Sequence, residues 1–177
     1  MSALRLLNQT NITSSVSTVS VTDVFSSDFE IYKIVTEGLS TTGTDQTDPN
    51  LRFISAGGSI VRSSNYDYAH QIMRMDSSFT EQRQTNQAQL YRFFGEGSDQ
   101  APETANSVGY VFSPFNSSRY TFVAYQSSNS AAGLDLPMKG IGVLKQSGSM
   151  TGFQVIDANG SRPFASGTIK TYGLAVS

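Results

Sequence analysis

Apolar and polar residues alternate along several short stretches of the chain. The clearest strand is 28–36, where Phe29 and Ile31 fall on one face of an extended segment and Tyr32 and Ile34 on the other. In 18–22, the apolar Val19 and Val21 alternate with polar Ser and Thr residues. Such alternation with a period of two is typical of a β-strand that is buried on one side. Strands are also predicted at 18–22, 51–55, 108–112, 119–126, 139–145, 152–157 and 164–174.

Turn-forming residues separate these stretches. Ala56-Gly57-Gly58-Ser59 is typical of a tight hairpin, and 157–161 carries the turn sequence Asp-Ala-Asn-Gly-Ser. No stretch of about twelve residues has a convincing amphipathic helical pattern. About ten short strands joined by turns predict an all-β protein, a sandwich or a barrel.

Two segments are harder to assign. In 66–75, Tyr68, Ile72 and Met75 have helical spacing. The alternation of Tyr66, Tyr68, His70 and Ile72 instead fits a strand. A strand is predicted there, because the neighbouring segments are strands and helix-favouring Ala and Leu are scarce. The polar segment 76–89 is predicted to be a loop or a frayed helix.

Composition agrees with β-structure in a single domain. Of 177 residues, 38% are apolar and only 15% are charged, compared with roughly 25% in a typical globular domain. Polarity comes instead from Ser, Thr, Asn and Gln, which favour strands and turns over helices. We predict an N-terminal arm or first strands at 1–24 and one β-sandwich domain at 25–177.

Charge and targeting signals narrow the function classes. The net charge is −2 and no Lys/Arg cluster exists, so a nucleic-acid partner is not expected. The chain has no Cys, which excludes a disulfide framework. It shows no signal-peptide pattern and no run of about 20 apolar residues, so we expect no membrane association and synthesis in a cytoplasm.

Candidate catalytic groups do not form a recognisable motif. His70 is the one histidine, and it lies in a Tyr-rich segment where a structural role is expected. Glu96, Asp99 and Glu103 could in principle act as paired carboxylates in glycoside hydrolysis, but their Gly-rich setting favours a loop. No nucleophile elbow or phosphate loop is present. The sequence therefore predicts a protein that is not an enzyme.

Two clusters could supply oxygen ligands to a cation. One contains Asp45, Asp48 and Asn50, and the other contains Asp157 and Asn159 before Gly160. Neither has the ligand spacing and closing Glu of a calcium loop, so turn formation is the preferred interpretation and no metal or other cofactor is predicted. Asn-x-Ser/Thr sequences begin at Asn8, Asn11, Asn116 and Asn159, and a Ser/Thr-rich chain contains these by chance.

Eight tyrosines are a further candidate feature. They could stack on sugars or pack across a subunit contact, although core and sheet packing is the expected role for most of them. The six candidates for such contacts are Tyr66, Tyr68, Tyr91, Tyr110, Tyr120 and Tyr125.

The C-terminal third contains the segments 139–144 (KGIGVL), 150–155 (MTGFQV) and 162–174, which includes 164–174 (FASGTIKTYGL). These segments, and 164–174 most strongly, resemble the end of many tailed-bacteriophage particle proteins. Weaker likeness extends upstream to about residue 25. The resemblance implies a jelly-roll-like antiparallel β-sandwich of about 8–10 strands. Gly167 is expected to allow a bulge, and Gly173 a close approach.

The resemblance also implies a function. We expect a non-enzymatic phage virion structural protein, foremost a capsid decoration (cement) protein on the particle surface. The alternative is a tail or fibre component that binds a host carbohydrate or receptor. Expected partners are capsid or tail proteins and further copies of the chain, for example in a trimer. The expected location is the virion, assembled in the host cytoplasm.

Overall fold

The computed structural model describes residues 4–42, 47–76, 79–98, 103–131, 134–158 and 162–175. These residues contain twelve β-strands and no helix, and hence no helix that could cross a membrane. The strands are β1 (Leu4–Ile12), β2 (Thr18–Val21), β3 (Ile31–Thr41), β4 (Pro49–Ser55), β5 (Tyr66–Met73), β6 (Phe79–Gln87), β7 (Ala105–Phe112), β8 (Thr121–Ala131), β9 (Leu134–Asp135), β10 (Met138–Leu144), β11 (Met150–Asp157) and β12 (Phe164–Leu174).

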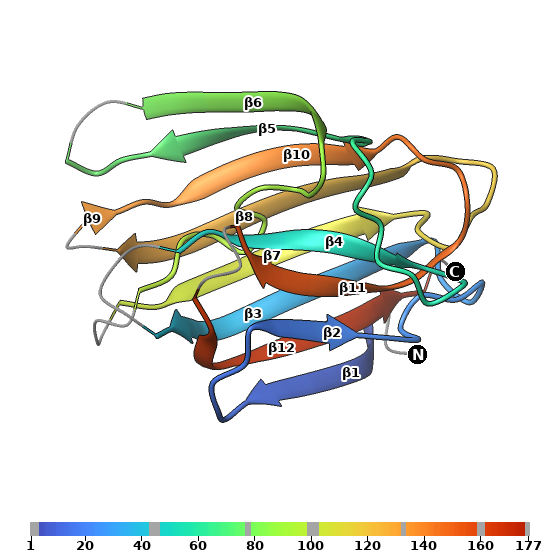
Figure 1. The fold of residues 1–177 in the computed structure, drawn as a ribbon, viewed down its shortest axis with the longest axis horizontal. Helices are drawn as coiled ribbons and strands as arrows, with labels where there is room; N and C mark the ends of the chain where they lie inside the picture. The colour runs from blue at the N-terminus through green and yellow to red at the C-terminus, as the bar shows by residue number, and fades with distance from the viewer. Residues whose placement is uncertain are drawn as a thin grey trace.

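The strands form two antiparallel sheets that pack as layers. The large sheet has the order β1-β12-β3-β7-β8-β10-β5-β6, with the short β9 beside β8. The small sheet, β2-β11-β4, lies across its middle (Figure 1). The predicted antiparallel β-sandwich is thus confirmed.

The strand order is that of a jelly roll. In an eight-strand jelly roll, strands from opposite ends of the chain alternate in each of two sheets. Here β1-β12-β3-β7 form one such set and β2-β11-β4 begin the other. Leu90 supplies the missing fourth element of the second set, because its backbone N–H and C=O both bond to Leu51 of β4, at 2.9 and 3.0 Å.

Two insertions enlarge this jelly roll on one side. The hairpin β5–β6 is inserted between β4 and Leu90, and the β8–β10 strands are inserted between β7 and β11. β10 pairs with both β5 and β8, so the two insertions continue the large sheet outward from β7. The result is twelve strands rather than the eight to ten expected.

The structure resolves both ambiguous segments as strands. The strand predicted within 66–75 is confirmed as β5, with Tyr66, Tyr68 and His70 on its buried side. The loop or frayed helix predicted at 76–89 is wrong, because residues 79–87 form β6. β6 is an edge strand whose residues are almost all exposed, so it has no apolar alternation to reveal it, and pairing with β5 determines its conformation.

Aromatic side chains fill the space between the sheets. Phe53 and Phe153 come from the small sheet, Tyr32 and Tyr66 come from the large sheet, and Phe25 lies between them. The Tyr66 hydroxyl accepts a hydrogen bond from the backbone N–H of Phe53 at 2.9 Å. Buried tyrosines thus pack as apolar groups while their hydroxyls stay satisfied.

Both glycine predictions for the last strand are confirmed. Gly167 has φ of +139°, and the pairing of β12 with β3 shifts register beside it, between Ser166 and Thr168. At Gly173, a Cβ atom would lie 2.6 Å from the ring of Phe29. At the other end of the chain, residues 4–12 pair with β12 and residues 18–21 pair with β11, so each sheet contains one N-terminal strand.

Candidate functional site

Several polar residues noted in the sequence gather around Arg92. A turn places Arg92 in a left-handed backbone conformation, with φ of 54°, and its backbone N–H donates to Asn50 Oδ1 at 2.7 Å. Its Nε donates to Asp48 Oδ1 at 2.7 Å, and its guanidinium also forms an ion pair with Glu96. The Tyr91 hydroxyl donates to Asp48 Oδ2 at 2.6 Å.

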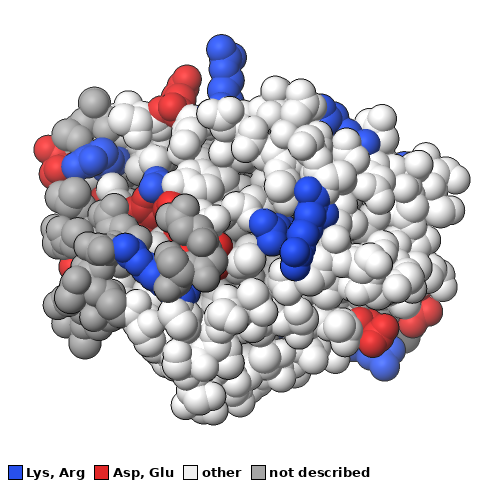
Figure 2. Space-filling model, viewed as in Figure 1, with Lys and Arg blue, Asp and Glu red and all other residues white. Residues whose placement is uncertain are grey.

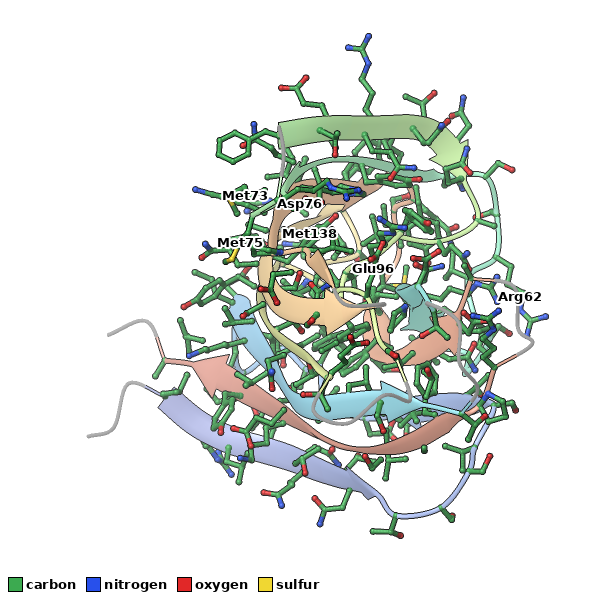
Figure 3. The ribbon with its side chains drawn as sticks, turned by 90° about the vertical axis from the view of Figure 1, so that its left-hand side faces the viewer. Arg62, Met73, Met75, Asp76, Glu96 and Met138 are labelled. Atoms are coloured by element: carbon green, nitrogen blue, oxygen red, sulfur yellow. The ribbon has the colours of Figure 1, made fainter. Side chains whose placement is uncertain are left out.

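This cluster joins two carboxylates through one cation. Glu96 lies between the two sheets with only 1% of its surface exposed (Figure 3). Burial raises the pKa of Glu96, and the positive charge of Arg92 opposes that shift. Because Arg92 engages both Asp48 and Glu96, we interpret the cluster as a structural clamp that holds the 90–97 segment against the start of β4.

The structure separates the other acidic candidates. Glu103 precedes β7, and Asp99 lies outside the described residues. Asp45, Asn159 and Gly160 also lie outside them, and Asp157 is buried at the end of β11. Within the described ranges, no group of three or more His, Asp or Glu side chains is placed to hold a metal ion.

His70 is held inside an aromatic stack. It is 4% exposed, and its ring lies 5.7 Å from that of Tyr68 and 6.1 Å from that of Tyr91. Its two ring nitrogens contact Gln82 Oε1 at 3.1 Å and the Tyr125 hydroxyl at 3.3 Å. Burial lowers the pKa of His70, which favours the neutral imidazole. These contacts indicate a structural role.

The tyrosines divide between the interior and the surface. Tyr66, Tyr68 and Tyr125 are buried, and Tyr91 is half-buried in the clamp. Tyr110 and Tyr120 are exposed. Of these two, Tyr110 points from β7 away from the core, on the side of the large sheet opposite the small sheet.

The side of the large sheet opposite the small sheet is termed here the outer face. Residues that point there alternate with buried residues along each strand. Strand pairing aligns them into two adjacent, mainly apolar rows. The first row is Leu4, Leu174, Ile31, Phe112, Phe122 and Val143; the second is Leu6, Tyr172, Lys33, Tyr110, Ala124, Ile141 and Ala69.

The outer face is hollowed over the inserted strands. A hollow of about 850 Å³ lies where the small side chains of Ala124 and Ala69 flank Ile141. Its lining also includes Tyr110 and five polar side chains: Gln71, Glu81, Arg83, Gln126 and Lys139. None of these five side chains forms a hydrogen bond or ion pair with another described residue. The hollow can therefore offer apolar contact together with free donors and acceptors.

No protein-family model, curated protein or solved structure is significantly similar to this chain.

The sequence contained one signal for this face. Several strands are apolar on both sides: in 121–126, Phe122 accompanies the buried Val123, and in β10 Ile141 and Val143 accompany the buried Leu144. An antiparallel sheet with one side in water has polar residues on that side. The departure predicts a second apolar face, although only the long-range register shows which residues meet.

Proposed function

We propose that this chain is a non-enzymatic building block of a virus particle and that it self-associates through the outer face. The observation that carries the proposal is the pair of apolar rows, which cross the large sheet without a covering element in the described chain. Contiguous exposed apolar surface of this kind marks interaction sites in soluble proteins.

The exposed area suits a subunit interface. Five large residues of the outer face are between 36 and 64% exposed: Leu4, Leu6, Tyr110, Phe122 and Ile141. At about 200 Å² for a complete large side chain, they expose on the order of 450 Å² of mainly apolar surface. A standard interface buries about 800 Å² per partner, of which a little over half is apolar. The two rows can thus supply the apolar centre of such an interface.

Placement on a tailed bacteriophage rests on the resemblance of 164–174 to phage particle proteins. A jelly roll with an exposed apolar face is compatible with a capsid decoration protein, which must contact other copies or the shell.

The Arg92 clamp and the enclosed His70 leave no convergent acid–base pair in the described chain, which supports a role without catalysis.

Light scattering coupled to size-exclusion chromatography tests the self-association. We expect a homo-oligomer at micromolar concentration, and a monomer up to about 100 µM would contradict the proposed self-association.

Mass spectrometry of purified particles tests the virion role, since a decoration protein would be found in many copies. Absence from the particles would overturn the virion assignment while leaving the oligomer result intact.

The hollow favours a second candidate, a tail or fibre component that binds carbohydrate. Its exposed Tyr110 and five unpaired polar side chains match the mixture of stacking and hydrogen bonding used for sugars. A glycan array with the isolated protein tests this, with Tyr110→Ala as the comparison. Binding that Tyr110→Ala reduces at least tenfold would favour this candidate, whereas no binding at high protein concentration would exclude it.

A further inference from the structure

A row of polar side chains crosses the surface of the small sheet, on the side of the molecule away from the outer face. β11 pairs with β2 on one side and β4 on the other, which places Gln154 opposite both Ser20 and Arg52. Directly opposite residues in antiparallel strands point to the same side of a sheet. Ser20, Gln154 and Arg52 thus form one line.

The chain after β4 extends this row by a second arginine. A backbone bridge joins Ile54 to Ile60, and Val61 N–H donates to the carbonyl of Phe53 at 2.9 Å. Both contacts have the same antiparallel register. One residue further along that register, Arg62 lies opposite Arg52.

Two cations thus face each other without a compensating acid. Neither Arg52 nor Arg62 forms an ion pair with a residue in the described ranges. Burial lowers the pKa of Arg52, and the charge of Arg62 lowers it further. Figure 2 shows a basic cluster near the centre of this face, with no acidic side chain beside it, and Arg62 projects from the edge of the molecule in Figure 3. Like charges in this arrangement destabilise a sheet.

Two buried atoms in the same row have no hydrogen-bond partner among the described residues. They are the donor Nε of Arg52 and the acceptor Oε1 of Gln154, and of the two only the arginine N–H can bind an anion. Gln154 is only 5% exposed, and its Nε2 donates to Ser20 Oγ at 3.3 Å. A buried guanidinium N–H without an acceptor costs free energy, so an acceptor placed beside Arg52 would be stabilising.

We propose that the facing pair Arg62 and Arg52 binds an oxyanion, either a carboxylate or a phosphate group. The planar guanidinium donates in a fork that matches both groups, and two facing guanidinium groups can share one anion. The anion removes the repulsion between Arg52 and Arg62 and gives Arg52 Nε its missing acceptor. The site lies on the small sheet, so it is independent of assembly through the outer face.

Thermal unfolding at constant ionic strength tests the site. Sodium chloride is replaced stepwise by inorganic phosphate or by glucuronate, a sugar carboxylate, with glucose as the neutral control. At a free anion concentration about five times the Kd, we expect the Tm to rise by about 2–4 °C. In Arg62→Gln that rise should disappear. Without the anion, Arg62→Gln should be at least as stable as the parent chain, because the repulsion is gone.

Arg119→Gln is the matched control, because Arg119 is an exposed arginine between β7 and β8 that belongs neither to the row nor to the hollow. It should keep the full anion response. A response to glucuronate alone would identify the ligand as a sugar acid, and a response to phosphate alone would identify it as a phosphate group. An equal rise in Tm in the parent chain and in Arg62→Gln, or no rise in either, would overturn the proposal.

Discussion

Arg92 anchors the irregular segment 90–97, which takes the place of a regular jelly-roll strand. It follows Leu90, which completes the second jelly-roll sheet, and its left-handed backbone directs the guanidinium to Asp48 and Glu96. The sequence places Asp48 and Glu96 in two separate candidate clusters, 48 positions apart. Their meeting depends on the folded path of the chain, so the sequence alone could not predict the clamp.

Removing Arg92 should therefore destabilise the fold strongly. Arg92→Met would leave two carboxylates close together, one of them buried, and we expect a loss of about 2–4 kcal/mol in the free energy of unfolding. Urea unfolding at pH 7 measures it. Arg74→Met is the control, because the Arg74–Asp76 pair is largely exposed and should matter little. Similar, small effects of both substitutions would show that the clamp does not stabilise the protein.

His70 should make stability depend on pH near neutrality. Its pKa is close to 6.5 in an unfolded chain and is lowered by burial in the fold. Between those two values the unfolded state binds more protons, so the free energy of unfolding should decrease as the pH falls below about 6.5, by at most about 1.4 kcal/mol per pH unit.

The chain has one histidine, so a single substitution isolates this contribution. His70→Gln retains hydrogen-bonding capacity and cannot titrate. Its Tm should vary less than that of the parent chain between pH 7 and pH 5.5. Parallel pH profiles for the two proteins would contradict the assignment.

At the scale of elements, two glycines make room for large side chains on the inner side of the large sheet. The 90–97 segment covers the inner side of β7 and β10, where Gly109 and Gly142 leave room for large side chains. A Cβ atom at Gly109 would lie 2.3 Å from Cζ of Phe93, and one at Gly142 would lie 2.5 Å from a methyl of Leu90. These glycines let an irregular segment pack closely where a second sheet would otherwise be needed.

Gly109→Ala should thus cost about 1–3 kcal/mol through overpacking against Phe93. Gly57→Ala is the matched control, because a Cβ there meets only Ser55 Oγ at 4.0 Å. It should be neutral or slightly stabilising. Chemical denaturation of both variants provides the comparison, and equal midpoints would contradict the packing argument.

Local patterns predicted the elements unevenly. Alternation identified β3, β8, β11 and β12, because a period of two is visible within one strand. β6 was missed, since it is polar on both sides and is determined by its partner. The outer face was missed for a related reason: each strand contributes only two or three of its residues, and their alignment depends on pairings between distant segments.

For the whole molecule, the two insertions have a single consequence. They widen one sheet of the jelly roll from four strands to nine, and this enlarges the outer face, which the three-stranded small sheet does not cover because it packs on the opposite side. In an isolated monomer, exposed apolar residues on this face would promote aggregation at high protein concentration. Their presence is explained if another molecule covers them, which is the basis for proposing self-association.

A charge placed in the second row should then separate assembly from folding. Ile141 is 64% exposed and contributes to the outer face rather than the core, so Ile141→Glu should change the Tm by only a few degrees. In the oligomer, the same carboxylate would be buried against apolar surface without a partner. The Kd of the oligomer should therefore increase at least tenfold. Thr18→Glu, an exposed change on the small sheet, should leave the oligomer intact. Light scattering over a dilution series measures both variants. If Ile141→Glu and the parent chain dissociate at the same concentration, the interface must lie elsewhere.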